Sequence, residues 1–286
     1  MKKFNDLLTI CMVSFHSDAI IKKILKIIPL KYKVIVTDNV ISNNLKDKLE
    51  NSFKNVEVIT PNLNLGNGGG VNYALKKIKT KYALYLDLDT TLEEDTIDKL
   101  INIANSQKNW GIIAPNIKNF YYKENCYTKK NISQNISEMN FVEGCALLFN
   151  MDVLNKIGPF DEKIFLYFEE NDLFFRCLKN NKKILLSHNT YIEHLGGSSV
   201  DKKYNLEIEL NRNWHYMWSK FYYYKKNYSY LRGLKETIIQ FIKAIIKLSF
   251  YYFINKNKFL IYKNRFSGLF NSYINRSSWR RPDIKR

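Results

Sequence analysis

The first hundred residues alternate between short apolar runs and amphipathic segments, and this alternation restricts the fold more than any other feature of the chain. Strands are predicted at residues 7–15, 32–36, 56–59 and 82–86, and helices at 19–28 and 71–78. A strand-helix-strand alternation of this kind gives an α/β fold, a mostly parallel sheet with helices on both faces. In such open sheets, ligands bind outside the carboxyl ends of the strands.

Two carboxylates stand at one of these strand ends. The run at 82–86 leads directly into Asp87-Leu88-Asp89, and the two-residue period of a strand places Asp87 and Asp89 on the same side. Paired carboxylates repel each other unless a positive charge joins them. Mg2+ or Mn2+ suits such oxygen ligands and commonly links them to nucleotide phosphates. Asp38 ends the second predicted strand, so we expect it to face the same crevice.

A glycine-rich segment precedes the helix predicted at 71–78. It runs from Asn64 to Asn72 as Asn-Leu-Gly-Asn-Gly-Gly-Gly-Val-Asn. Glycines allow the backbone to approach a ligand closely, and amide groups near a helix start can point at an anion. The segment is neither a Rossmann glycine motif nor a Walker A loop, because no Gly-Lys-Ser/Thr follows.

The second half of the chain adds an acidic helix start and a late histidine. Further strands are predicted at 111–115 and 141–149, around a polar stretch at 121–140, and helices at 98–106 and 169–178. Glu169, Glu170 and Asp172 occupy the first turn of the last helix, where a carboxylate could serve as a general base. His194 follows a short predicted strand, where a neutral imidazole could complete a metal site.

The net charge of +18 is concentrated at the C-terminal end. Residues 202–286 carry 19 Lys and Arg against 4 Asp and Glu, whereas residues 1–201 carry 26 against 23. The basic stretch is also rich in Tyr, Phe and Trp, a composition typical of a nucleic-acid surface or a membrane interface. We expect two domains, residues 1–201 and a helical tail at 202–286.

Within this tail, residues 234–254 form an amphipathic helix pattern. Lys243, Glu236, Lys247 and Gln240 fall on one narrow polar stripe, and the remaining positions are mostly Ile, Phe, Leu and Ala. Lys243 and Lys247 interrupt the apolar run that a spanning helix needs. We therefore predict a helix that lies in an anionic membrane surface, with packing of its apolar face on the domain of residues 1–201 as the alternative.

The order of these segments resembles the family 2 glycosyltransferases of the GT-A fold, especially the bacterial rhamnosyltransferase-like branch that builds cell-surface polysaccharides. The resemblance covers about residues 7–200. The matching motifs are Val13-Ser14-Phe15-His16, Asp38-Asn39, Asn64 to Asn72, Asp87-Leu88-Asp89, Gly158 to Glu162, Glu169 to Arg176, and His194 to Ser198.

The resemblance implies roles for individual residues. The nucleotide-sugar side would comprise Ser14, Phe15, Asp38, Asn64, Gly66, Gly69, Asn72 and Asp87. Asp87, Asp89 and His194 would hold Mg2+ or Mn2+, and Glu143 with Gly144 would line the acceptor side. Glu170 would deprotonate the acceptor hydroxyl in a single, inverting displacement, with Glu169 and Asp172 as alternative bases.

The resemblance also implies partners and a location. The donor would be a UDP-, dTDP- or GDP-linked sugar, the acceptor a lipid-linked saccharide, and nucleic acid is not an expected partner. The chain starts without a long apolar stretch and has four widely spaced cysteines, so we expect a cytoplasmic protein on the inner membrane face. The oligomeric state stays open, with a homodimer as one option. Alternative functions are a nucleotidyltransferase acting on sugar phosphates and a non-enzymatic nucleic-acid-binding protein.

Overall fold

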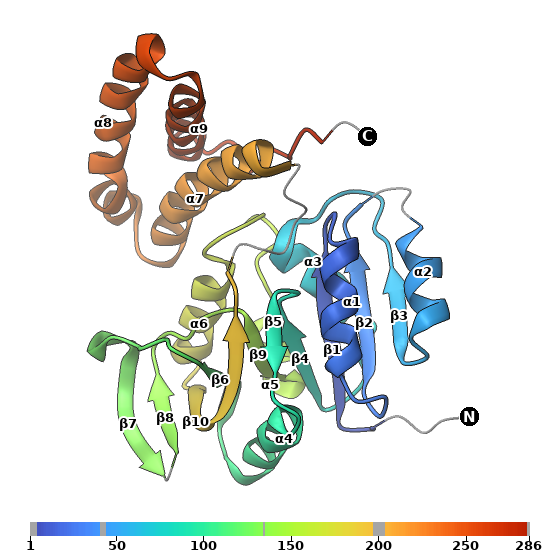
Figure 1. Cartoon of the computed structure of the whole chain (residues 1–286). Helices are drawn as coiled ribbons and strands as arrows, with labels where there is room; N and C mark the ends of the chain where they lie inside the picture. The colour runs from blue at the N-terminus through green and yellow to red at the C-terminus, as the bar shows by residue number, and fades with distance from the viewer. Residues whose placement is uncertain (1–4, 41–43, 134, 197–203, 285–286) are drawn as a thin grey trace. The chain divides into compact units, whose positions relative to one another are not determined.

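The fold is described from a computed structural model that covers residues 5–40, 44–133, 135–196 and 204–284 (Figure 1). The strands are β1 (Leu8–Ser14), β2 (Lys33–Asp38), β3 (Val56–Ile59), β4 (Tyr82–Leu86), β5 (Thr90–Leu92), β6 (Trp110–Ile117), β7 (Tyr127–Ser133), β8 (Ile136–Met139), β9 (Ala146–Asn150) and β10 (Lys183–His194). The helices are α1 (Asp18–Ile27), α2 (Leu45–Ser52), α3 (Gly66–Leu75), α4 (Thr96–Ser106), α5 (Met151–Ile157), α6 (Glu169–Lys179), α7 (Asn205–Asn227), α8 (Tyr230–Ile254) and α9 (Lys256–Tyr273), with a short 3-10 turn at Glu124–Cys126.

The chain forms two compact units. The first comprises residues 1–65, 70–160 and 173–201, and the second comprises residues 66–69, 161–172 and 202–286. Each unit is described by itself below. The division into residues 1–201 and 202–286 stays a prediction.

The first unit is built on one mixed sheet. Its strand order is β3-β2-β1-β4-β9-β6-β10-β8-β7, and β5 pairs with β10. The neighbours β3, β2, β1 and β4 are parallel, and β6 and β10 are parallel to each other. Three strands run against this common direction: β9 lies antiparallel between β4 and β6, and β8 and β5 both pair antiparallel with β10. The predicted α/β class with a mostly parallel sheet is confirmed.

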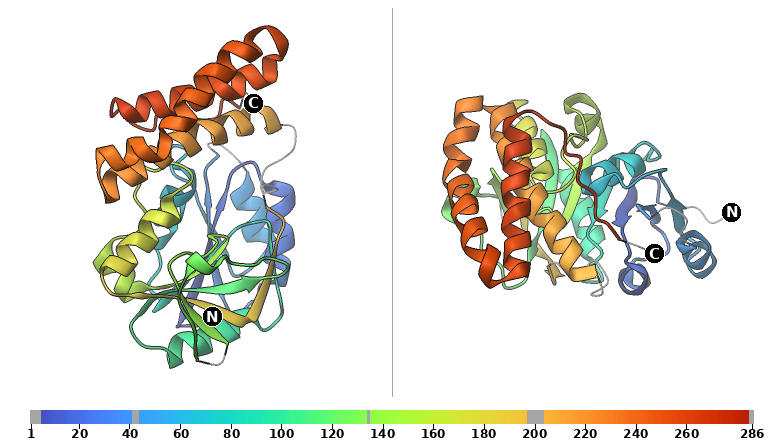
Figure 2. Two further views of the ribbon diagram at one scale, coloured as in Figure 1. Left: turned by 90° about the vertical axis from the view of Figure 1, so that its left-hand side faces the viewer. Right: turned by 90° about the horizontal axis from the view of Figure 1, so that it is seen from above.

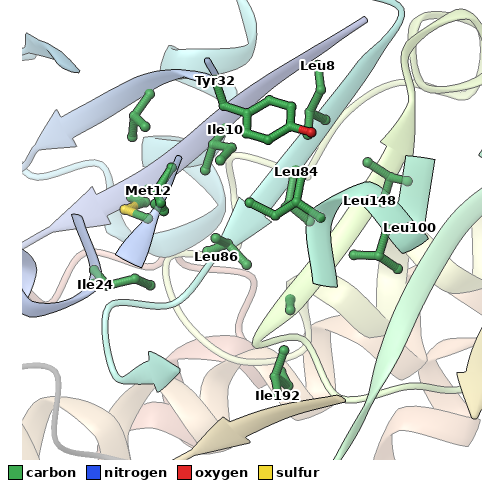
Figure 3. Packing of buried hydrophobic residues seen from close by; sticks show 14 of the residues in the cluster. Leu8, Ile10, Met12, Ile24, Tyr32, Leu84, Leu86, Leu100, Leu148 and Ile192 are labelled. Atoms are coloured by element: carbon green, nitrogen blue, oxygen red, sulfur yellow. The ribbon is translucent and has the colours of Figure 1, made fainter. Parts of the chain in front are cut away.

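The two-residue period of the strands divides the core into two layers. Leu8, Ile10 and Met12 of β1 face one layer, with side chains from α1, α2 and α4 (Figure 3). Cys11 of the same strand faces the other layer, which contains side chains from α3, α5 and α6. Helices therefore cover both faces of the sheet, as the alternation in the sequence predicts.

The structure contains two helices, α2 and α5, that were not predicted from the sequence, and it differs from the prediction in further places. The stretch at 121–140, expected to be a polar excursion, contains the β7–β8 hairpin. The strand expected from residue 141 begins at Ala146, and the helix expected from residue 71 begins at Gly66. Glycine is a poor helix former, so local preference does not predict this early start.

The second unit contains three long helices, α7, α8 and α9, which lie against one another (Figure 2). Two glycines permit their close approach. A Cβ atom at Gly268 of α9 would lie 2.3 Å from the Trp214 carbonyl oxygen of α7, and one at Gly233 of α8 would lie 2.8 Å from the Phe221 ring. Met217, Phe221 and Leu269 form the buried centre of this helical group.

Candidate active site

The paired carboxylates Asp87 and Asp89 follow the fully buried strand β4. Asp89 is buried and Asp87 is partly exposed. The Asp87 amide donates to the Cys145 carbonyl oxygen at 2.8 Å, and the Thr90 hydroxyl donates to the Asp87 carbonyl oxygen at 2.6 Å. The Tyr85 hydroxyl also donates to the Asp87 carboxylate. The strand end is therefore held by backbone and side-chain contacts, which orient both acids.

A long-range strand pairing brings His194 to these acids. The short strand β5 begins directly after Asp89 and pairs antiparallel with the end of β10, with Thr90 opposite His194. As a result, His194 Nε2 lies 3.4 Å from Asp89 Oδ1 and 3.7 Å from Asp87 Oδ2. The sequence placed His194 in the same metal group but gave no signal for β5, which has only three residues.

The electrostatics of this cluster favour a cation. The pKa of Asp87 is raised to about 6, chiefly by desolvation and also by the charge of Asp89, whereas the Tyr85 hydrogen bond and His194 oppose this shift. The pKa of His194 is raised by its hydrogen bond to Asp89, against the opposing effect of its own burial. Burial and mutual repulsion therefore disfavour two ionised acids at this position unless a positive charge lies beside them.

The donor atoms of Asp87, Asp89 and His194 all lie within 4.8 Å of one another. They offer two carboxylate oxygens and one imidazole nitrogen, a set that fits a divalent cation such as Mg2+ or Mn2+. Among the residues that the structure describes, Asp87, Asp89 and His194 are the one group of three or more His, Cys, Asp or Glu side chains close enough together to hold a metal ion.

The predicted nucleotide-side residues gather at the ends of β1 and β2. Ser14 and Asp38 are register partners in these parallel strands, and both are buried. The Asn39 amide donates to the Ser14 carbonyl oxygen at 2.8 Å. Phe15 follows Ser14 and is partly exposed, with its ring edge-to-face against His16. Ser14 and Asp38 therefore meet at one sheet edge, the edge at which β4 also ends.

Helix α3 lies close to these strand ends because it begins with glycines. A Cβ atom at Gly70 would lie 2.8 Å from the Val13 side chain, and the Thr37 hydroxyl donates to the Gly70 carbonyl oxygen at 2.8 Å. The Asn39 side chain accepts a hydrogen bond from the Leu65 amide at 3.2 Å. The glycine-rich segment is thus the first half of a helix rather than a turn before one.

The predicted residues of this segment have different surroundings. Asn64 is partly exposed, and Gly66 and Gly69 are buried. Asn72 is buried, and its amide group both donates to and accepts from the backbone of Phe160, at 2.8 and 3.0 Å. This paired contact ties α3 to residue 160, so Asn72 supports the fold.

The acidic turn of α6 belongs to the second unit, and its three carboxylates differ. Asp172 is fully buried; its carboxylate lies 2.7 Å from Lys226 Nζ and accepts a hydrogen bond from Asn227. Glu169 is 1% exposed and accepts from the Asn67 side chain at 3.2 Å. Glu170 is partly exposed. Of the three candidates for a base, Glu170 is therefore the most accessible residue.

The two residues before this turn have an unusual backbone. Tyr167 and Phe168 have φ angles of 65° and 67°, the left-handed region that aromatic residues rarely adopt. Their rings contact Tyr216 of α7, and the Phe168 ring also contacts Tyr223. Strained backbone of this kind persists where the surroundings over-determine it, and it is concentrated at functional sites.

The predicted acceptor-side residues flank the carboxylate pair. Glu143 and Gly144 are both partly exposed, and they precede Cys145, whose carbonyl oxygen accepts from Asp87. Burial raises the pKa of Glu143, and the nearby His194 opposes this. Ser198, the last residue of the late histidine motif, lies outside the described residues.

Some residues that contact the predicted site residues within each unit carried no clear sequence signal. Tyr85 could have been recognised, because it lies two residues before Asp87 on the same strand face. Thr90 of β5 pairs with His194 of β10. Lys226 contacts Asp172 from a helix that follows the acidic turn by more than fifty residues. Sequence spacing alone cannot connect such distant residues.

A parallel-stranded α/β unit with an Asp-x-Asp pair and a histidine at its strand ends is the architecture of GT-A-type transferases. A family model, that of glycosyl transferase family 2, matches residues 9–158, just over half of the chain. The chain therefore belongs to glycosyl transferase family 2.

The low-salt glycan biosynthesis hexosyltransferase Agl10 of Haloferax volcanii is 24% identical over 202 residues, 63% of this chain and 64% of that protein. This chain thus spans somewhat less than two thirds of that relative. Among solved structures, the mannosyltransferase PcManGT of Pyrobaculum calidifontis, in complex with GDP-Man and Mn2+, has a TM-score of 0.58 at 10% identity, over 93% of this chain and 86% of that one. S. aureus TarS 1–349 with UDP-GlcNAc has a TM-score of 0.55 at 12% identity, over 94% and 92%. These structures share the GT-A-like fold with this chain.

Proposed function

We propose that the protein transfers a sugar from a nucleotide-diphosphate donor to a hydroxyl group of an acceptor. The observation that carries this proposal is the convergence of Asp87, Asp89 and His194 at the carboxyl end of a parallel sheet. Paired carboxylates at this position suit a divalent cation and the diphosphate of a nucleotide sugar. The activity is supported further by membership of glycosyl transferase family 2.

On the donor side, Asp87, Asp89 and His194 would hold Mn2+ or Mg2+. When bound, such a cation supplies positive charge that stabilises the departing diphosphate. Asp38 would accept hydrogen bonds from the base, and Ser14 and Phe15 would contact it at the end of β1. Residues 64–72 would approach the diphosphate through the backbone, where glycines leave room.

On the acceptor side, Glu170 would remove the proton of the attacking hydroxyl group. Its partial exposure supports this assignment over Glu169 and Asp172, whose carboxylates are buried. The hydroxyl oxygen would attack the anomeric carbon from the face opposite the diphosphate, so the configuration at that carbon inverts. Glu143 and Gly144 would line the acceptor.

We further propose a lipid-linked saccharide acceptor and a role in cell-surface polysaccharide synthesis. The motif order supports a rhamnosyltransferase-like enzyme, and the glycan-biosynthesis relative supports a hexosyl or deoxyhexosyl donor. The donor nucleotide would be UDP, dTDP or GDP; the fold neighbours carry GDP-Man and UDP-GlcNAc.

The helix α8 supports a location on the inner face of the cytoplasmic membrane. By length and composition alone it could cross a membrane, and 11% of its most apolar window is buried. Gly233, Thr237 and Ala244 are the buried residues of this helix, whereas the opposite face is exposed and mostly apolar, apart from Lys235 and Ser249. The exposed residues of this face are Leu231, Ile238, Ile239, Ile242, Ile245, Ile246, Phe250 and Phe253. Lys243 and Lys247 flank this face, so we propose that α8 lies in the surface of an anionic membrane.

The donor half of the proposal is tested with UDP-, dTDP- and GDP-sugars, with and without Mn2+. A bound donor must raise the thermal stability of the protein, and the stabilising donor should then support transfer. Asp89→Ala should lose the Mn2+-dependent stabilisation and lower kcat by more than about a hundredfold. Asp152→Ala, at an exposed acid of α5, is the matched control and should keep both. Full transfer by Asp89→Ala would refute the assignment.

Glu170→Gln tests the base separately. The amide keeps the shape of the side chain but cannot accept the proton, so kcat should fall about 100- to 10,000-fold. Donor stabilisation should be unchanged, because Glu170 is not assigned to the donor. Activity near the wild-type value would exclude Glu170 and direct attention to Glu169.

A further inference from the structure

Helix α7 contacts the acidic segment, defined here as residues 161–172, at both of its ends and in its middle. We propose that α7 holds this segment in its working conformation and that Lys226 is a positioning residue for the proposed base Glu170. The inference rests on the proposed function, because Glu170 is assigned there. It concerns the second unit alone, which contains both α7 and the acidic segment.

Lys226 joins the two ends of the segment. Its ammonium lies 2.8 Å from Asp161 Oδ2 and 2.7 Å from Asp172 Oδ1. Asp172 is completely buried and lies in the first turn of α6, two residues after Glu170. One cation therefore fixes both the start of the segment and the helical turn that carries the proposed base.

Hydrogen bonds from α7 reinforce this ion pair. The Tyr222 hydroxyl donates to Asp161 at 2.9 Å, and the Asn227 side chain donates to Asp172 at 3.0 Å. Burial raises the pKa of Asp161, but Lys226, the Lys163 amide and Tyr222 together lower it below its usual range. Asp161 therefore carries a negative charge beside the Lys226 ammonium.

The middle of the segment is held by the same helix. The Ser219 hydroxyl donates to the Leu166 carbonyl oxygen at 2.8 Å. The Phe165 ring stacks on His215 at 4.5 Å between ring centroids, and the Arg281 guanidinium lies 4.1 Å from that ring. Together with the rings of Tyr216 and Tyr223 against the strained Tyr167 and Phe168, these contacts fix the backbone that leads into Glu170.

Lys226 also sets the net charge of the helical turn that carries the base, because its ammonium contacts the buried Asp172 carboxylate. Without this ammonium, the Asp172 carboxylate would be left uncompensated, and a negative charge in this turn favours the protonated form of Glu170. Other ionisable groups also act on this turn. Tyr222 and Tyr223 of α7 interact electrostatically with Asp172. Tyr167 of the segment interacts with Glu169 and Glu170, and Arg212 and Tyr216 of α7 act on the same Tyr167.

The experiment compares the pH dependence of kcat for four variants of the full chain. Lys226→Met should lower kcat about tenfold to a hundredfold, because small displacements of a reacting group have effects of this size. It should also move the acidic limb of the profile to higher pH. Lys226→Arg keeps the charge and should keep the wild-type limb. The double variant Lys226→Met/Asp172→Asn removes both charges and should return the limb toward its wild-type position.

Lys225→Met is the matched control, because the Lys225 ammonium contacts Asn275 and not the acidic segment. It should leave both kcat and the pH profile unchanged. Thermal stabilisation by the donor with Mn2+ reports on the first unit and shows which variants are folded. If Lys226→Met does not fold, Lys226→Arg and the double variant decide the question by the position of their acidic limbs.

The outcomes separate this inference from the proposed function. If the wild-type protein transfers no sugar from any donor, the proposed function fails. If the wild type is active and Lys226→Met keeps both its kcat and its acidic limb, α7 has no positioning role. If the acidic limb of the pH profile stays shifted in the double variant, the uncompensated charge of Asp172 does not cause the shift, which likewise contradicts the inference.

Discussion

At the scale of the residue, His215 shows how burial selects a protonation state. It is completely buried in α7; its Nε2 lies 2.9 Å from the Arg280 carbonyl oxygen, and its Nδ1 lies 3.1 Å from the Ser278 hydroxyl. A carbonyl can only accept, so Nε2 carries the hydrogen and Nδ1 accepts from Ser278. Burial lowers the pKa of His215 to about 3, although the Arg280 carbonyl opposes the shift.

This residue predicts a pH dependence of stability. The unfolded chain protonates His215 near its ordinary pKa of 6.5, whereas the folded chain does so only near 3. The unfolded state therefore binds more protons between these values, and stability falls as the pH decreases below 6.5, by at most about 1.4 kcal/mol per pH unit. His215→Gln should remove this contribution, because the amide can still donate to Arg280 but does not titrate.

Urea unfolding at several pH values checks the prediction. Trp214 and Trp218 lie beside His215 on α7, so tryptophan fluorescence follows the correct unit. Above pH 7.5 the stability difference between the wild type and His215→Gln should be constant. If the unfolding free energies of the wild type and His215→Gln differ by a constant amount down to pH 4, burial does not hold His215 neutral.

At the scale of the element, sequence patterns identify the strands that carry the site but not the pairings between them. The strands β1, β2, β3 and β4 are continuous or alternating apolar runs, and the positions of Asp38, Asp87 and Asp89 follow from the ends of β2 and β4. Local patterns carry this information because the period of a strand is local. The position of His194 instead depends on β5, whose partner β10 comes about a hundred residues later.

The early start of α3 is another element that local preference cannot predict. Gly66 has a φ of 76°, and a Cβ atom there would lie 2.0 Å from the Phe165 carbonyl oxygen, within the second unit. The helix begins at Gly66 because tertiary contacts, including the Asn67 amide donating to that carbonyl oxygen at 3.0 Å, outweigh the poor helix preference of glycine. Such contacts appear only once the chain has folded.

Two glycine substitutions separate backbone strain from steric overlap. Gly196 has a φ of 58°, but a Cβ atom there would meet nothing within 4 Å. Gly196→Ala should therefore destabilise the protein by only about 1–2 kcal/mol, the left-handed backbone penalty. Gly66→Ala has the same penalty plus the overlap with Phe165, so it should destabilise by more than about 3 kcal/mol. Equal unfolding free energies for the two variants would contradict the close approach of Gly66 to residue 165.

At the scale of the whole molecule, charge and apolar surface are both concentrated in one part of the chain. Residues 1–201 are nearly balanced, whereas residues 202–286 hold almost all of the excess of +18. The same residues carry the exposed apolar face of α8. A nucleic-acid surface would need the charge without the apolar face, whereas an anionic membrane complements both. Within the tail, α7 has many buried residues, whereas α8 exposes an apolar face.

This arrangement predicts that the protein binds anionic vesicles through α8. Phe253 is 87% exposed, and Ile246 and Phe250 are 61% and 58% exposed, so replacing all three by Ser should leave the helical group folded. The wild type should sediment with phosphatidylglycerol vesicles more than with neutral ones, and salt should weaken the binding because it screens the basic residues. The triple variant should lose most of this binding, since the buried apolar area supplies the insertion energy.

The matched control replaces three exposed apolar residues of the first unit, Ile27, Leu30 and Tyr121, by Ser. It should bind the vesicles like the wild type, because these residues are not on α8. Extraction of cell membranes with alkaline carbonate then separates the two ways in which α8 could meet lipid. Carbonate should extract the protein from the membrane if α8 lies in the membrane surface, whereas a protein with a spanning helix stays in the membrane. Retention in the membrane would overturn the surface location proposed from Lys243 and Lys247. Equal vesicle binding by the α8 variant and the control would instead exclude α8 as the attachment site.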